Sequence, residues 1–148
     1  MGAASLSAMR SKDPNTQVGC CIVGAKNRIG SVGYNGLPFR CDDDEYPWSR
    51  RMEGLEENET KYPYVVHSEF NAILNYRGES LEGAKMYVTM FPCCECAKAI
   101  IQSGIREVIY WDVAYLHSQS GIAAACMFKS AGVTVRQFSC GEKIDIQI

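Results

Sequence analysis

The chain has 148 residues, of which 47% are hydrophobic, and a formal net charge of −2 at pH 7. This length suits one domain, so we expect a single domain over residues 1–148. Proteins that bind nucleic acid through its phosphates are usually basic, so the charge disfavours that class of partner. No stretch approaches the roughly 18 apolar residues of a membrane span, and the first residues lack the pattern of a signal peptide.

The periodicity of apolar residues predicts a hairpin followed by alternating helices and strands. The opening "MGAASLSAMR" looks like the later part of a helix, and 17–24 with 28–35 predict the hairpin. Three helix–strand pairs then follow, at "SEFNAILNYRG" with 84–91, "CCECAKAIIQSG" with 106–112, and "SGIAAACMFKSAG" with 133–138. In the first of these helices, Phe70, Ile73 and Leu74 are expected on one buried face. Such β-α-β units favour parallel neighbours, which predicts a five-stranded mixed sheet with flanking helices.

Residues 35–64 form a long polar connection that contains prolines and glycines. A connection of this length in a compact domain is usually functional. The alternative is a disordered surface insertion.

The chain contains eight cysteines, an even number that could form disulfide bonds. Because the chain shows no secretion pattern, we expect free thiols in a reducing, cytoplasmic compartment. Cys20 and Cys21 lie in the apolar run "VGCCIVG" and are both expected to be buried. Cys126 is expected on the core face of its helix.

One histidine and two cysteines have the spacing of a zinc site. The stretch "VHSEFNAI" places His67 at the start of one helix, and "FPCCECAK" places Cys93 and Cys96 in the first turn of another. Imidazole and thiolate are the ligands that Zn²⁺ takes most readily, and a helix N-terminus stabilises thiolates. Two such helix starts at one edge of a sheet can meet around one ion. The sequence therefore predicts a Zn²⁺ site, with Cys94 rotated away from it.

The number of ligands distinguishes a catalytic zinc site from a structural one. Catalytic sites commonly have three protein ligands and a water, whereas structural sites have four protein ligands. No fourth ligand is obvious here, although His117 is a candidate for a structural site. Glu69, two residues after His67, is expected to transfer protons, which favours catalysis. A metal-free thiol redox pair is a further alternative that leaves His67 and Glu69 without a role.

Together these motifs resemble those of the deoxycytidylate (dCMP) deaminases of the cytidine deaminase superfamily, over nearly the whole chain. His-x-Glu with Pro-Cys-x-x-Cys marks the superfamily, and "SKDPNTQVG", "GYNG" and "TKYPYV" narrow it to the nucleotide enzymes. The resemblance implies a three-layer α-β-α cytidine deaminase-like fold and zinc-dependent hydrolysis of dCMP to dUMP and ammonia, which feeds thymidylate synthesis. It also implies a hexamer that dCTP activates and dTTP inhibits, with Mg²⁺ accompanying the effector.

The resemblance further implies a role for each residue of the metal motif. His67, Cys93 and Cys96 are expected to hold Zn²⁺. Glu69 is expected to take a proton from water, protonate N3 of the pyrimidine and help deliver a proton to the departing amine.

Candidates for substrate contacts also come from the resemblance. Asn35 of "GYNG" is a candidate for the sugar hydroxyl, with a simple turn role as the alternative. Ser11 and Lys12 are candidates for binding the 5′-phosphate, with Tyr115 closing over the phosphate. A solvated lysine and a packing tyrosine are the alternatives. Residues 42–45, "DDDE", form either a solvated cluster or a contact to the effector or Mg²⁺.

Three features depart from the family pattern, and two other functions compete. Ser68 stands where alanine is usual, Cys94 stands where asparagine is frequent, and the N-terminal helix is short. A deaminase of the same fold that acts on tRNA or single-stranded DNA is disfavoured by the acidic charge and by the family stretches. A catalytically inactive zinc-binding or assembly module is disfavoured by Glu69. We therefore expect nucleotide partners, with no nucleic acid and no membrane.

Overall fold

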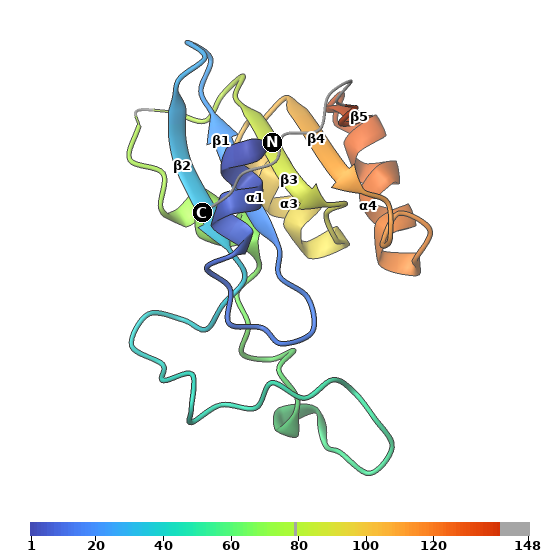
Figure 1. The fold of residues 1–148 in the computed structure, drawn as a ribbon. Helices are drawn as coiled ribbons and strands as arrows, with labels where there is room; N and C mark the ends of the chain where they lie inside the picture. Colours follow the sequence, from blue (N-terminus) through green and yellow to red (C-terminus); the bar gives the residue numbers. More distant parts are fainter. Residues whose placement is uncertain (79, 140–148) are drawn as a thin grey trace.

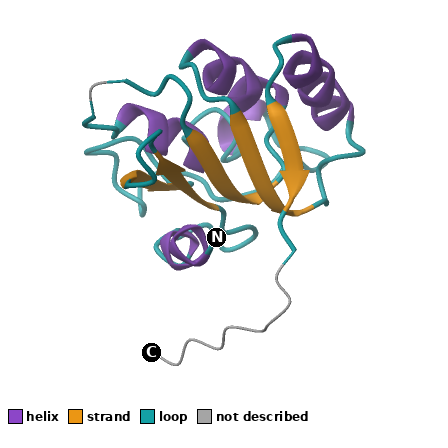
Figure 2. Ribbon diagram, turned by 90° about the horizontal axis from the view of Figure 1, so that it is seen from above, coloured by secondary structure: helices purple, strands orange, loops and turns teal. Residues whose placement is uncertain are grey.

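The chain folds around one sheet that carries helices on both faces (Figure 1, Figure 2), and the computed structural model describes residues 1–78 and 80–139. The strands stand in the order β2-β1-β3-β4-β5. β1 is antiparallel to β2 and β3, while β3, β4 and β5 are mutually parallel. The strands are β1 (Gly19–Val23), β2 (Ile29–Tyr34), β3 (Lys85–Met90), β4 (Glu107–Asp112) and β5 (Thr134–Gln137). This confirms the predicted five-stranded mixed sheet.

In the described residues, four α-helices cover the sheet and complete the three-layer α-β-α arrangement that was expected. α1 (Gly2–Ala8) lies on one face over β1 and β2, and the other three helices lie on the opposite face (Figure 2). Those three are α2 (Ser68–Leu74), α3 (Cys94–Gln102) and α4 (Gln119–Ser130). None of the helices in the described part of the chain is long and apolar enough to cross a membrane.

Two glycines let the helices rest directly on the sheet. A Cβ atom at Gly19 would lie 1.9 Å from the carbonyl oxygen of Ala4 in α1. A Cβ atom at Gly33 would lie 2.2 Å from the carbonyl oxygen of Ser68 and 2.5 Å from the amide of Ala72 in α2. Because real Cβ atoms do not come so close, glycine is required at both positions. The second contact matters for the site, because it lets the first turn of α2 pack closely on β2.

The sequence pattern misplaced two side chains. Leu74, expected beside Phe70 and Ile73 on the buried face of α2, is 67% exposed, because Ser68, Glu69 and Ala72 form the face that meets the sheet. Cys126, expected in the core, is exposed. Its helix buries Gly121, Ala124 and Phe128, a spacing that turns Cys126 to the opposite side.

The thiols otherwise follow the expectation. Cys20 and Cys21 are both buried in β1, and the seven cysteines in the described residues are free. Cys140 lies outside the described residues.

The long connection between β2 and α2 is tied to the body of the fold at both ends. Its base closes with a bridge in which the amides of Gly36 and Val66 each donate to the other's carbonyl, at 3.1 and 2.8 Å. In between, the chain extends away from the sheet (Figure 1) and carries one short 3₁₀ helix, η1 (Glu57–Glu59). The bridge brings the segment that follows β2 next to the segment that precedes α2, at the same edge of the sheet as the carboxyl end of β3.

Candidate functional site

The starts of α2 and α3 bring together the histidine and the two cysteines predicted to bind metal. His67 is the N-cap of α2 and Cys93 the N-cap of α3, where the Cys93 sulfur accepts from the amide of Cys96 at 3.5 Å. The Nδ1 atom of His67 lies 3.3 Å from the Sγ atom of Cys96 and 3.4 Å from that of Cys93. All three ligand atoms lie within 4.8 Å of one another.

These residues fit a zinc ion in both chemistry and spacing. A tetrahedral Zn²⁺ with Zn–N of about 2.0 Å and Zn–S of about 2.3 Å places its nitrogen and sulfur ligands about 3.5 Å apart. The separations of 3.3 and 3.4 Å agree with that value. Within residues 1–78 and 80–139, this is the one group of its kind, and His117 is not part of it. As expected, Cys94 is outside the group, with its Sγ atom 3.9 Å from Glu95.

Hydrogen bonds make the two thiols unequal. The pKa of Cys93 is lowered to about 4, because its sulfur accepts from the Cys96 thiol, from His67 and from the Cys96 amide. The pKa of Cys96 is raised, because its thiol donates to Cys93 and because it is buried. The hydrogen bond to Cys93 also raises the pKa of His67. In the metal-free protein, Cys93 is therefore a thiolate and Cys96 a thiol, so metal binding must displace the Cys96 proton.

Glu69 is a buried carboxylate next to this group. It lies in the first turn of α2 and is only 4% exposed, and its Oε2 atom accepts from the Ser68 hydroxyl at 2.9 Å. Burial raises the pKa of Glu69, and the neighbouring His67 opposes this effect only in part. A carboxyl group with a raised pKa in a pocket can hold and release a proton near neutral pH.

One pocket joins the metal group, Glu69 and the long connection, and it encloses about 170 Å³. It lies between the starts of α2 and α3, the carboxyl end of β3 and the connection. The lining residues are Asp13, Thr16, Val18, Asn35, Arg50, Lys61, Tyr62, Val65, His67, Ser68, Glu69, Met90, Phe91, Cys93 and Tyr115.

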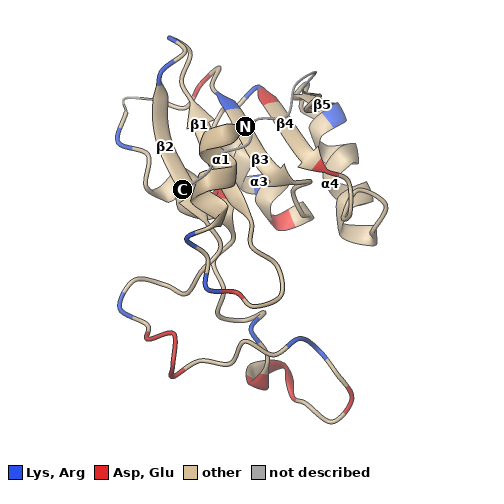
Figure 3. Ribbon diagram, viewed as in Figure 1, with Lys and Arg blue, Asp and Glu red and all other residues tan. Residues whose placement is uncertain are grey.

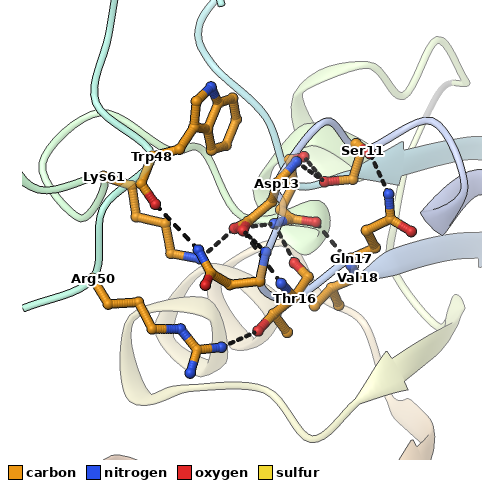
Figure 4. A network of polar contacts seen from close by, with 10 residues as sticks. Ser11, Asp13, Thr16, Gln17, Val18, Trp48, Arg50 and Lys61 are labelled. Atoms are coloured by element: carbon orange, nitrogen blue, oxygen red, sulfur yellow. Dashed lines mark hydrogen bonds and ion pairs between the residues drawn. The ribbon is translucent and has the colours of Figure 1, made fainter.

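A buried ion pair beside the pocket was not foreseen from the sequence. The carboxylate of Asp13 pairs with the ammonium group of Lys61, and the two side chains are 1% and 9% exposed (Figure 4). Asp13 also accepts from the amides of Asn15 and Thr16, at 2.8 and 3.2 Å, and from the Asn35 side chain at 3.2 Å. "SKDPNTQVG" and "TKYPYV" contain the two charges, but the partners are 48 positions apart and no local pattern joins them.

Asn35 lies at the pocket with most of its hydrogen-bonding capacity already used. Its Nδ2 atom donates to Asp13 at 3.2 Å and to the carbonyl of Thr16 at 2.9 Å. Its Oδ1 atom accepts from the amide of Val18 at 2.7 Å. One lone pair of Oδ1 remains, so Asn35 can accept a hydrogen bond from a ligand but cannot donate one.

The other predicted substrate contacts separate into two groups. Tyr115 lines the pocket, whereas Ser11 and Lys12 do not. The Ser11 hydroxyl is buried and donates to the carbonyl of Asn35 at 2.7 Å. Lys12 has a side chain that is 70% exposed and pairs with Asp43 of the "DDDE" run at 2.5 Å.

Comparison with known proteins places the chain among deaminases. The family described as "Cytidine and deoxycytidylate deaminase zinc-binding region" matches residues 1–112. "Deoxycytidylate deaminase" of Homo sapiens is 53% identical over 93% of this chain and 76% of its own length. "Probable deoxycytidylate deaminase" of Drosophila melanogaster is 49% identical over 93% of this chain and 69% of its own.

A solved structure with the same architecture is a dCMP deaminase from the cyanophage S-TIM5, crystallised with dCMP and dUMP. It superposes with a TM-score of 0.70 at 26% identity and covers 93% of this chain and 92% of the phage chain. Three observations point to the same family: the fold, the grouping of His67 with two cysteines, and these relatives. The chain belongs to the cytidine and deoxycytidylate deaminase family.

Proposed function

We propose that this chain hydrolyses dCMP to dUMP and ammonia, with Zn²⁺ held by His67, Cys93 and Cys96. The observation that carries the proposal is the buried carboxylate of Glu69 in the same pocket as the metal group. A structural metal site has no need of a proton carrier beside it. The names of the relatives, deoxycytidylate deaminases from animals and a phage, support dCMP as the substrate.

The chemistry divides between the ion and Glu69. Zn²⁺, when bound, would act as a Lewis acid that makes water a nucleophile near neutral pH. Glu69 accepts a proton from the water that attacks C4 and delivers it to N3 of the pyrimidine. It then passes the second proton of that water to the 4-amino group, which leaves as ammonia. Proton transfer of this kind contributes about 10²- to 10⁴-fold to the rate.

The raised pKa of Glu69 suits both halves of this cycle. A carboxyl group with an ordinary pKa would hold a proton too weakly to return it to the pyrimidine at neutral pH. Burial favours the neutral form of Glu69, and the nearby His67 favours the charged form. Burial is the larger effect, so the pKa of Glu69 is raised and the carboxyl group holds a proton more firmly than an exposed glutamate does.

The sugar and phosphate contacts complete the proposal. Asn35 accepts a hydrogen bond from a sugar hydroxyl through the free lone pair of its Oδ1 atom. Tyr115 contacts the 5′-phosphate. Ser11 acts indirectly in this scheme, because its hydroxyl holds the backbone of Asn35.

Assembly and regulation follow from the family resemblance. We extend the proposal to a cytoplasmic, single-domain protomer of a hexamer, which supplies dUMP for thymidylate synthesis. In this scheme dCTP, accompanied by Mg²⁺, activates the enzyme and dTTP inhibits it. Exposed apolar side chains on β2, with Ile29 at 62% and Val32 at 45%, support an assembly in which that edge is covered.

A substrate panel on zinc-loaded protein tests the proposal. Ammonia release is measured with dCMP, CMP, deoxycytidine, dCTP and a cytosine-containing single-stranded oligonucleotide, and zinc content is measured on the same sample. We expect dCMP to be the preferred substrate. Stretches of acidic residues separate the basic ones along the connection (Figure 3), which also favours a small substrate over a polynucleotide. Deamination of the oligonucleotide but not of dCMP would reject the proposal.

A further inference from the structure

Arg50 is a cation at the pocket whose charge is balanced by no carboxylate of residues 1–78 and 80–139. Its guanidinium lines the pocket and donates one hydrogen bond, from Nη2 to the Thr16 hydroxyl oxygen at 2.9 Å (Figure 4). Among the described residues, the ion pairs do not include Arg50. A guanidinium has five N–H donors in a planar fork, so most of its donors remain available.

The remaining charges of the pocket are already balanced. Asp13 and Lys61 neutralise each other as a buried pair. At the metal group, two thiolates would neutralise a divalent ion. Glu69 transfers protons in the proposed reaction and therefore does not pair with Arg50. The pocket therefore carries one uncommitted positive charge, and that charge belongs to Arg50.

The neighbouring cations Arg51 and Lys12 differ from Arg50, because each of them is paired with a carboxylate. Arg51 is engaged by Glu57, to which its Nε atom donates at 2.8 Å, and its guanidinium stacks over the Tyr62 ring at 4.2 Å. Lys12, the cation that the sequence suggested for the phosphate, pairs with Asp43 outside the pocket. Of the two consecutive arginines, one is engaged by the connection itself and the other is directed to the pocket.

The connection holds Arg50 in place through contacts of the two residues that precede it. The carbonyl of Trp48 accepts from the Asn15 side chain at 3.1 Å, and the carbonyl of Ser49 accepts from the amide of Lys61 at 2.9 Å. Lys61 is in turn anchored by Asp13. The backbone before Arg50 is therefore fixed against the turn at 13–16, so the guanidinium reaches the pocket from an anchored segment.

We propose that Arg50 binds the 5′-phosphate of the substrate and thereby selects nucleotides over nucleosides. The inference rests on the proposed function for the identity of the substrate. The guanidinium fork matches two phosphate oxygens. The Thr16 hydroxyl accepts from Arg50 and keeps its own hydrogen, so it can donate to the same phosphate. Arg50 takes the role that the sequence suggested for Lys12.

Steady-state kinetics with two substrates test the role of Arg50. In zinc-loaded protein, Arg50→Ala should lower kcat/KM for dCMP by about 10- to 100-fold, the effect of losing a charge-assisted hydrogen-bond pair. The value for deoxycytidine, which lacks the phosphate, should stay within about twofold and also reports an intact fold. Arg51→Ala, the matched control, should leave the preference between the two substrates unchanged. An equal loss on both substrates, or no loss on dCMP, overturns the inference.

Calorimetry with product separates this inference from the proposed function, because it needs no turnover. Wild-type protein should bind dUMP more tightly than deoxyuridine, and Arg50→Ala should lose that difference. If wild type fails to deaminate dCMP but still shows this Arg50-dependent preference, the proposed function falls and the phosphate contact stands. If wild type deaminates dCMP and Arg50→Ala keeps the full preference for dUMP, the phosphate contact is refuted and the proposed function stands.

Discussion

Replacing Lys61 by methionine tests how strongly the buried ion pair holds the connection on the fold. The substitution keeps most of the aliphatic volume of Lys61 but leaves the carboxylate of Asp13, 2% exposed, without its counter-charge. Removing one partner of a buried pair costs about 3–5 kcal/mol. Asp13 keeps three N–H donors from Asn15, Thr16 and Asn35, so we expect a loss at the lower end, about 3 kcal/mol.

Urea unfolding of zinc-loaded protein, at fixed protein and zinc concentrations, measures this loss. The double variant Asp13→Asn with Lys61→Met removes both charges and should be less destabilised than the sum of the single variants, by at least about 1 kcal/mol. Additive losses, or a loss below about 1 kcal/mol for Lys61→Met, would refute the claim that this pair anchors the connection.

The remaining predictions concern the metal group and the packing of α2 on β2 at Gly33. Between pH 6 and 8, zinc affinity should rise about tenfold per pH unit for each proton that zinc binding releases, because the pKa of Cys96 is raised and its proton must leave. Calorimetry in buffers of different ionisation enthalpy should detect the release of at least one proton. Zero proton release would contradict this protonation scheme. Cys96→Ala should abolish stoichiometric zinc binding, and full metal occupancy in that variant would reject the ligand set. Gly33→Ala should destabilise the fold by about 1–3 kcal/mol or more, because the added Cβ atom would lie 2.2 Å from the Ser68 carbonyl oxygen. In the control variant Gly36→Ala, the nearest atom to the added Cβ, on the Tyr34 ring, lies 3.4 Å away. Equal unfolding midpoints for the two variants would rule out this packing constraint.

The elements and the metal group were predictable because their signals are local. Period-two and period-3.6 patterns with glycine stops indicate strands and helices directly, and His67, Cys93 and Cys96 stand in short motifs at helix starts. The β-α-β order then predicts that those helix starts meet at one edge of the sheet. Burial on a single helix face was less predictable, as Leu74 and Cys126 show, because apolar residues stand on more than one side of each helix and tertiary packing decides which side is buried.

The polar lining of the pocket could not be predicted in the same way. Whether a cation is free or neutralised depends on partners that the fold supplies from a distance. Lys61 finds Asp13 across 48 positions, and Lys12 finds Asp43 outside the pocket. Arg50 and Arg51 are neighbours in sequence, yet only Arg51 has a carboxylate partner in the part of the chain that the structure describes. No pattern in the sequence distinguishes these outcomes.

The account depends most on Glu69 as the proton carrier beside the metal group. The most direct measurement is dCMP turnover by zinc-loaded Glu69→Gln, a variant that keeps the shape of the side chain and removes its ability to exchange protons. We predict unchanged zinc stoichiometry and a loss in kcat of at least about 10²-fold. Turnover within a few-fold of wild type, with zinc retained, would contradict the account.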